Sequence, residues 1–272
     1  MQAEWRRESD WLDALPRLAA ECAQRWDLVL EAPFDTPHSL VVPAGDVVLK
    51  LNAPCHYEAD YEAEALARWA GRGAVRIVAR DDARRALLIE RCVPGTRLAD
   101  SPGDEPAVVA ELLPALAIEA TEPHPFRTVA DEAARWEDEV RTRYDLSGRA
   151  FERSLLDVAV EVFRGADRYA TLLVNQDLHG GNFLRAEREP WLVIDPKPLV
   201  GELEVNGVGL LRNAAASRGT AAVRRCLNGL RDVGLDRERT RAWAIAHALA
   251  WGWKDGRWAE RSLDVARAIA AA

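Results

Sequence analysis

Two carboxylates and one amide in a short stretch of the chain have the types and spacing of a reactive centre. Asp177 and Asn182 lie in a polar, glycine-containing segment between two apolar runs, and Asp195 directly follows the second run. Phosphoryl transfer needs one carboxylate to orient an acceptor hydroxyl and take its proton, and a second carboxylate with a neutral oxygen to hold Mg²⁺. Asp and Asn are common turn residues, so either alone indicates only a turn. The ordered set, together with Lys50 on an expected upstream strand, favours phosphoryl transfer.

The elements that must position these residues follow from the hydrophobic pattern. The first hundred residues predict helices over 9–26 and 56–71. Short runs rich in Val, Leu and Ile predict strands over 28–30, 40–42, 47–51, 75–78 and 86–89. A polar loop is expected over 100–106, followed by helices over 106–120, 127–144, 150–169 and from 207 onward, with apolar runs at 172–174 and 191–194. This order predicts an α+β fold with a small β-rich N-terminal lobe (1–92) and a larger, mainly helical C-terminal lobe (93–272).

Composition restricts the class of protein. The chain has 272 residues, enough for two lobes that share a cleft, and a formal net charge of −8. The negative charge argues against nucleic-acid binding, which needs a basic face. No apolar stretch is long enough to span a membrane, no apolar run follows the two N-terminal arginines as in a signal peptide, and the four cysteines lack metal-binding or C-x-x-C spacing. We expect a cytoplasmic monomer with reduced thiols that binds neither nucleic acid nor membrane.

Several segments make the sequence recognisable. They are Val-Leu-Lys-Leu (48–51), Glu-Ala-Glu-Ala-Leu (62–66), Asn-Gln-Asp-Leu-His-Gly-Gly-Asn (175–182), Trp-Leu-Val-Ile-Asp-Pro-Lys-Pro (191–198) and Leu-Leu-Arg-Asn (210–213). In these segments the chain resembles the aminoglycoside and hydroxyurea phosphotransferase family, particularly the branch that contains the streptomycin 6-phosphotransferases. The resemblance begins at about residue 25, is most specific over 175–201, and implies a protein-kinase-like fold of two lobes.

The resemblance also implies roles for individual residues. Asp177 would be the catalytic base or the group that orients the acceptor hydroxyl, and Asn182 and Asp195 would bind Mg²⁺. Lys50 would contact the α- and β-phosphates of ATP or GTP. Its ion-pair partner would be Glu62 or Glu64, which point about 200° apart on a helix, so that only one can face Lys50. The family's Glu-x-x-x-Leu pattern favours Glu62.

Further roles concern the hinge, a second lysine and a histidine of the loop, and the last two keep two interpretations. Residues Glu90 to Cys92 would form the hinge between the lobes and hold adenine through backbone groups. Lys197 could neutralise phosphate or form an ion pair inside the C-terminal lobe, and both remain open. His179 could be read as a general base, but kinase chemistry gives the proton to the aspartate, so a hydrogen bond that fixes the loop is preferred.

Three features depart from the family pattern. Asn175 replaces the usual His two residues before the catalytic Asp, and Asn206 replaces an Asp that commonly braces the catalytic loop. The expected nucleotide loop (33–39) has no glycine and contains two prolines that lack an N–H donor, so Thr36 and Ser39 would have to contact phosphate.

Together these observations predict an enzyme, an ATP-dependent phosphotransferase that inactivates a small hydroxylated antibiotic. A streptomycin-like aminoglycoside is the preferred acceptor, since the negative net charge of the chain suits a cationic substrate. Acidic residues over 131–139 could lie near that acceptor or form a solvated helix face. One alternative is a kinase of hydroxyurea or another hydroxylated metabolite, because fold does not determine the acceptor. A second is a non-catalytic nucleotide-binding protein, which the three departures favour and the intact Lys, Asp, Asn, Asp set disfavours.

Overall fold

The computed structural model describes residues 8–36, 39–101 and 104–272. The segment on which the signal-peptide prediction depends (1–7) lies outside the described residues. So do two residues each of the expected nucleotide loop (37–38) and of the expected loop at 100–106 (102–103). None of the described helices combines the length and the apolar character that crossing a membrane requires.

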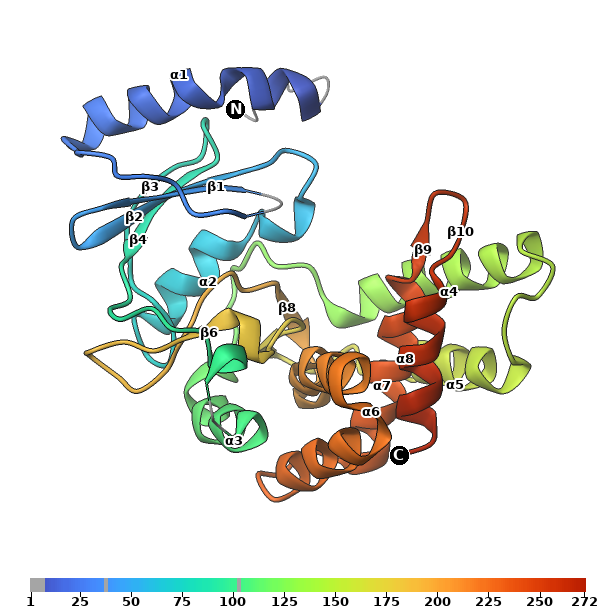
Figure 1. The fold of residues 1–272 in the computed structure, drawn as a ribbon. Helices are drawn as coiled ribbons and strands as arrows, with labels where there is room; N and C mark the ends of the chain where they lie inside the picture. The colour runs from blue at the N-terminus through green and yellow to red at the C-terminus, as the bar shows by residue number, and fades with distance from the viewer. Residues whose placement is uncertain (1–7, 37–38, 102–103) are drawn as a thin grey trace. The chain divides into compact units, whose positions relative to one another are not determined.

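The chain divides into two compact units. The first comprises residues up to Thr96 together with Leu184–Lys197, and the second comprises Arg97–Phe183 and Pro198–Ala272. Strands dominate the first unit and helices the second, as the colours along the chain in Figure 1 show. The α+β composition expected from the sequence is therefore confirmed.

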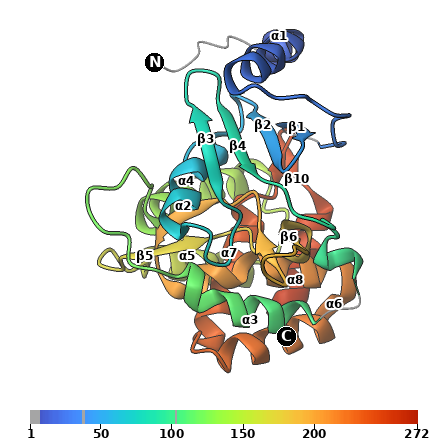
Figure 2. The ribbon, with the colours of Figure 1, turned by 90° about the vertical axis from the view of Figure 1, so that its left-hand side faces the viewer.

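The first unit is built on a four-stranded antiparallel sheet in the order β1-β2-β4-β3. The strands are β1 (Ser39–Ala44), β2 (Val47–Asn52), β3 (Ile77–Asp81) and β4 (Ala86–Glu90). Helix α1 (Glu8–Trp26) packs on one face and α2 (Glu62–Trp69) lies on the other (Figures 1 and 2). Because successive side chains of a strand alternate between faces, Leu49 and Leu51 enter the core with α1 and Lys50 points toward α2.

Several expected elements differ from those observed. Leu28–Leu30 is not a strand. The next residue, Glu31, donates its N–H to the carbonyl of Pro43 at 2.9 Å. The helix expected over 56–71 begins at Glu62, after a 3₁₀ turn at Tyr57–Ala59. The helix expected to extend to residue 169 ends at Arg164.

The segment Leu184–Lys197 joins the first unit through backbone pairing. The chain enters it at β6 (Phe183–Leu184) and continues through β7 (Leu192–Val193). The N–H of Val193 donates to Gly73 O at 2.9 Å, and the N–H of Val75 donates to Val193 O at 3.0 Å. This pairing explains why β3 starts at Ile77 rather than at residue 75, and it places Asp195 in the same unit as Lys50.

The second unit is a helical assembly with small β elements. Helices α5, α6 and α8 pack against α7, and α3 packs against α6 (Figure 2). Strand β5 pairs antiparallel with β8, and β9 with β10. The elements are α3 (Glu105–Leu116), α4 (Val129–Leu146), α5 (Arg153–Arg164), β5 (Leu172–Asn175), β8 (Pro198–Gly201), α6 (Val208–Arg231), α7 (Arg237–Ala250), β9 (Trp253–Lys254), β10 (Arg257–Trp258) and α8 (Glu260–Ala270). The β9–β10 hairpin interrupts the continuous helical region expected from the sequence.

Candidate active site

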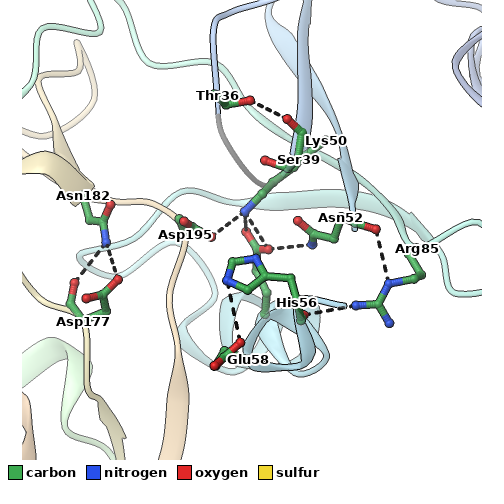
Figure 3. Close-up of polar contacts among 11 residues, drawn as sticks. Thr36, Ser39, Lys50, Asn52, His56, Glu58, Arg85, Asp177, Asn182 and Asp195 are labelled. Atoms are coloured by element: carbon green, nitrogen blue, oxygen red, sulfur yellow. Dashed lines mark hydrogen bonds and ion pairs between the residues drawn. The ribbon is translucent and has the colours of Figure 1, made fainter. Parts of the chain in front are cut away.

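In the first unit, one lysine bridges two carboxylates. The ammonium group of Lys50 lies 2.8 Å from both carboxylate oxygens of Glu62 and 2.7 Å from Asp195 Oδ1 (Figure 3). Glu62 is fully buried and Lys50 is 5% exposed. Three residues far apart in sequence thus meet because β2 directs Lys50 toward α2 and because the turn after β7 presents Asp195. The backbone of Asp195 has a φ of 47°, a left-handed conformation that is uncommon for residues other than glycine.

The charges of this group control one another. Burial works against the charged form of Lys50, but Glu62 and Asp195 raise its pKa above the ordinary lysine value. Burial likewise opposes ionisation of Asp195, yet the charges of Lys50 and Lys197 lower its pKa to about 2. Burial raises the pKa of Glu62, and Lys50 opposes that shift. Lys50 is therefore cationic and Asp195 anionic at neutral pH.

The structure distinguishes the two glutamates expected to compete for Lys50. Glu64 pairs with Arg68 at 3.2 Å and with Arg80 at 3.6 Å on the outer side of α2. Glu62 receives, besides Lys50, a hydrogen bond of 2.9 Å from the amide nitrogen of Asn52. Asn52 was not among the predicted site residues, although it lies two residues after Lys50 on the same face of the strand, which strand alternation predicts.

In the second unit, Asp177 and Asn182 lie side by side at the ends of one loop. The amide nitrogen of Asn182 donates to Asp177 O at 3.0 Å and to Asp177 Oδ2 at 3.3 Å (Figure 3). Since both bonds use the nitrogen, the amide oxygen of Asn182 is directed away from Asp177. This neutral oxygen and the ionised carboxylate of Asp195 are ligand types that fit Mg²⁺. Across residues 8–36, 39–101 and 104–272, no three His, Cys, Asp or Glu side chains form a metal cluster of their own.

The two asparagines that depart from the family pattern hold this loop. Asn206 Oδ1 accepts a hydrogen bond from the N–H of Asn175 at 2.9 Å, and Asn175 Oδ1 accepts one from the N–H of Asp177 at 3.1 Å. His179 Nδ1 accepts from the N–H of Gly181 at 3.1 Å, and its Nε2 lies 3.7 Å from Asp177 Oδ1. The hydrogen bond expected to fix the loop through His179 is therefore present.

A buried glutamate from a distant helix also supports the loop. Glu105, at the start of α3, accepts the N–H of Gly180 at 2.5 Å and the amide of Asn213 at 3.2 Å, and it forms an ion pair with Arg218. A side chain at Gly180 would lie 2.9 Å from the Glu105 carboxylate. Sequence reasoning missed Glu105, because the bond joins residues 75 positions apart and no local pattern marks it.

The residues expected at the hinge follow β4. The N–H of Glu90 donates to Arg76 O, and its carboxylate accepts from Arg188 at 2.9 and 3.0 Å, so the Glu90 side chain is committed to ion pairing. Among the described residues, the backbone N–H and C=O of Cys92 have no backbone partner. Burial raises the pKa of the Cys92 thiol to about 12, so it is not a nucleophile at neutral pH.

Two further expectations concern phosphate and acceptor contacts. The hydroxyl of Thr36 donates to the carbonyl of Ser39 (Figure 3), so it is used inside its own loop. Three acidic residues of α4 lie in ion pairs: Glu132 with Arg127 and Arg135, Glu137 with Arg164, and Glu139 with Arg143. These pairs reduce the negative charge that α4 could offer a cationic acceptor.

The chain is similar in sequence to two curated kinases of small molecules. A streptomycin 6-kinase from Streptomyces glaucescens is 34% identical over 267 residues, which cover 90% of this chain and 85% of the relative. A hydroxyurea phosphotransferase from Kitasatospora aureofaciens is 32% identical over 275 residues, covering 96% of this chain and 80% of the relative.

Solved structures show the same fold. A choline/ethanolamine kinase family protein from Mesorhizobium loti superposes with a TM-score of 0.68 at 16% identity, over 98% of this chain and 96% of that one. The GDP complex of aminoglycoside 2′-phosphotransferase-IIIa gives a TM-score of 0.63 at 16% identity, over 94% and 98% of the two chains. The protein-kinase-like fold expected from the sequence is confirmed. The family model described as aminoglycoside/hydroxyurea antibiotic resistance kinase matches residues 25–262, and the chain belongs to this family.

Proposed function

We propose that the protein transfers the γ-phosphate of ATP or GTP to a hydroxyl group of a small antibiotic and thereby inactivates it. The observation that carries the proposal is the cluster in which the buried Lys50 bridges the buried Glu62 and the half-buried Asp195. A cationic lysine held by a buried glutamate is suited to nucleotide phosphates, and the ionised Asp195 beside it is suited to a hard cation.

Each residue of the set has one role in this proposal. Asp177 accepts a hydrogen bond from the acceptor hydroxyl, orients its oxygen toward the γ-phosphorus and takes its proton. Asn182, whose nitrogen is bonded to Asp177, offers its amide oxygen to Mg²⁺ together with Asp195. Bound there, Mg²⁺ would offset the negative charge of the nucleotide phosphates. Lys50 contacts the α- and β-phosphates.

The remaining assignments complete the proposal. Residues 1–92 form the nucleotide-binding lobe and 93–272 carry the catalytic loop and the acceptor site. Adenine or guanine bonds to the backbone of Cys92, where no backbone partner competes within the described chain. Lys197 lowers the pKa of Asp195 and so favours its ionised form. We further propose that the enzyme acts as a monomer in the cytoplasm.

Two acceptors follow from the relatives. Streptomycin comes first, because a streptomycin 6-kinase is 34% identical to this chain. Hydroxyurea is the second candidate, because a hydroxyurea phosphotransferase is 32% identical over 96% of this chain. Both offer a hydroxyl, so the reaction class is the same for either.

The test is phosphoryl transfer by the purified protein with ATP or GTP and Mg²⁺, with streptomycin or hydroxyurea as acceptor and product mass as the readout. Asp177→Asn should lower the transfer rate by about 10²- to 10⁴-fold, the usual contribution of a positioned base, and should leave nucleotide binding intact. Asp145→Asn, an exposed change on α4, is the matched control. A wild-type protein that binds no nucleotide, or an Asp177→Asn variant with unchanged turnover, would contradict the proposal.

A further inference from the structure

An arginine lies beside Asp177 in a cavity of the second unit. The cavity has a volume of about 250 Å³, and its lining includes Asp177, His179, Gly209 and Arg212. Arg212 comes from α6 and is half-buried. The volume admits a phosphoryl group and a few further atoms, since a water molecule occupies about 30 Å³ of liquid.

Arg212 has an unusual set of contacts for a half-buried arginine. Within the part of the chain that the structure describes, its guanidinium has no hydrogen-bond or ion-pair partner. Its Cζ lies 5.1 Å from the ring centroid of Trp251. This distance is within the range of a cation–π interaction, which orients the planar guanidinium over the indole. Trp251 in turn packs against His247 on α7, with ring centroids 4.3 Å apart.

The guanidinium of Arg212 can therefore bind an anion. Arginine carries five N–H donors in a fixed fork that matches phosphate oxygens. Because no polar group of the described chain occupies these donors, an anion that enters the cavity can bind them directly. Burial lowers the pKa of Arg212, and the charge of Asp177 opposes that shift, so Asp177 is the charged group that acts on it. Arg261 also lines the cavity but is exposed, so water already solvates it.

We propose that Arg212 binds the phosphoryl group on the acceptor side of the reaction, and that Trp251 is a positioning residue that holds Arg212 there. This inference rests on the proposed function. In the step, the acceptor oxygen forms a bond to the γ-phosphorus, the bond between that phosphorus and the β–γ bridging oxygen breaks, and the nucleoside diphosphate leaves. The hydroxyl proton passes to Asp177, and Arg212 donates N–H groups to oxygens of the transferring group.

The kinetic test compares substitutions at the two positions. Arg212→Met should lower kcat by at least about 10³-fold, the effect of removing an arginine that stabilises transition-state charge, with nucleotide affinity unchanged. Trp251→Leu should lower kcat by roughly 3- to 30-fold, as loss of a cation–π contact predicts, and Trp251→Phe by less because a ring remains. Arg225→Met is the control, since Arg225 is exposed on the same helix.

Two readouts separate phosphate binding from a purely structural role. Added guanidinium ions should partly restore the activity of Arg212→Ala, which no packing defect would allow. Calorimetric titration with inorganic phosphate, in the presence of ADP and Mg²⁺, should show binding by the wild type and by Arg225→Met but not by Arg212→Met.

The outcomes are distinct. Arg212→Met with wild-type kcat and wild-type phosphate affinity would overturn the inference, as would a loss of activity that guanidinium does not restore and that parallels a loss of thermal stability. If the wild type transfers no phosphate to any acceptor but binds inorganic phosphate through Arg212, the proposed function fails and the anion site stands.

Discussion

The side-chain oxygen of Asn206 accepts a hydrogen bond of 2.9 Å from the backbone N–H of Asn175. The nitrogen of the same fully buried amide donates to Leu203 O at 3.0 Å. Asn206 therefore accepts on one side and donates on the other, which a carboxylate cannot do. The two asparagines that depart from the family pattern are hydrogen-bonded to each other, and the catalytic loop is held without a charge at residue 206.

Asn206→Asp should destabilise the protein. The new carboxylate would face the carbonyl of Leu203 and leave it without a donor, at a cost of about 1–3 kcal/mol in the free energy of unfolding. Urea denaturation at pH 7 measures the change. Asn228→Asp, an exposed substitution on α6, should cost less than about 1 kcal/mol. Equal stability of Asn206→Asp and the wild type would show that the amide is not required.

Lys50→Met should destabilise the first unit in a pH-dependent way. In the wild type, the lowered pKa of Asp195, about 2, means that its ionised form stabilises the fold above the ordinary carboxyl pKa and that this contribution is lost as the pH falls toward 2. Without Lys50, two neighbouring carboxylates have no shared cation, and their folded pKa values rise. A carboxyl group whose pKa is raised by folding lowers the stability of the folded protein as the pH rises. The destabilisation caused by Lys50→Met should therefore grow between pH 5 and pH 8.

The size of that defect can be bounded. Removing one partner of a buried ion pair costs about 3–5 kcal/mol at neutral pH. The double variant Lys50→Met/Glu62→Gln should recover part of this, because it removes the fully buried charge that lost its partner. Urea denaturation at pH 5 and pH 8 measures both variants. A destabilisation that is independent of pH, or a double variant no better than the single one, would contradict this account of the cluster.

The sequence predicted the parts of the site that depend on local patterns. Strand alternation places Lys50 opposite Leu49 and Leu51, and the 200° separation on α2 allows only one of Glu62 and Glu64 to face it. The loop from Asp177 to Asn182 follows from its polar, glycine-bearing composition between apolar runs. Periodicity restricts where the side chains of β2 and α2 can point, and the family's Glu-x-x-x-Leu pattern is what favoured Glu62 over Glu64.

Contacts between distant segments could not be predicted in the same way. Leu28–Leu30 has strand composition but is not paired as a strand. The chain meets β1 only after this segment, where the N–H of Glu31 donates to Pro43 O and Phe34 is bridged to Val41. The β9–β10 hairpin depends on a two-residue turn in which Asp255 and Gly256 have positive φ, a signal that was hidden within a region of helical composition. Glu105 and Arg212 gain their significance only from neighbours contributed by other elements of the fold.

Glu105→Ala should loosen the catalytic loop and leave the buried N–H of Gly180 without an acceptor, at a cost of about 1–3 kcal/mol. A displacement of the loop by about 1 Å would lower kcat by roughly 10²-fold. Glu105→Gln keeps an oxygen for Gly180 and should lose less activity. Arg218→Met removes the ion pair but not the loop contact, and serves as the control. Steady-state kinetics with denaturation curves separate the effects, and Glu105→Ala with normal kcat would refute the bracing role.

A substitution at Gly209 tests the same loop from the side of α6. Gly209 has no side chain, so the backbone of α6 lies close to the backbone of the catalytic loop. A methyl group at Gly209 would lie 2.7 Å from Leu178 N and 2.9 Å from Asp177 C, so either the helix or the loop must move. Alanine gains about 1 kcal/mol of helix propensity over glycine, yet overpacking costs about 1–3 kcal/mol. Gly209→Ala should therefore lower the free energy of unfolding by about 0–2 kcal/mol. It should lower kcat by about 10²-fold through displacement of Asp177.

The matched control for Gly209→Ala is Gly229→Ala on the same helix. There the added methyl group would meet only the side chain of Pro106, at 3.3 Å, and no part of the catalytic loop. Both variants gain the same helix propensity, so the comparison isolates the contact with the loop. Gly229→Ala should retain wild-type kcat and equal or higher stability. If Gly209→Ala also retained wild-type kcat, Asp177 would tolerate a displacement that a precisely oriented base could not, and its role in catalysis would have to be reconsidered.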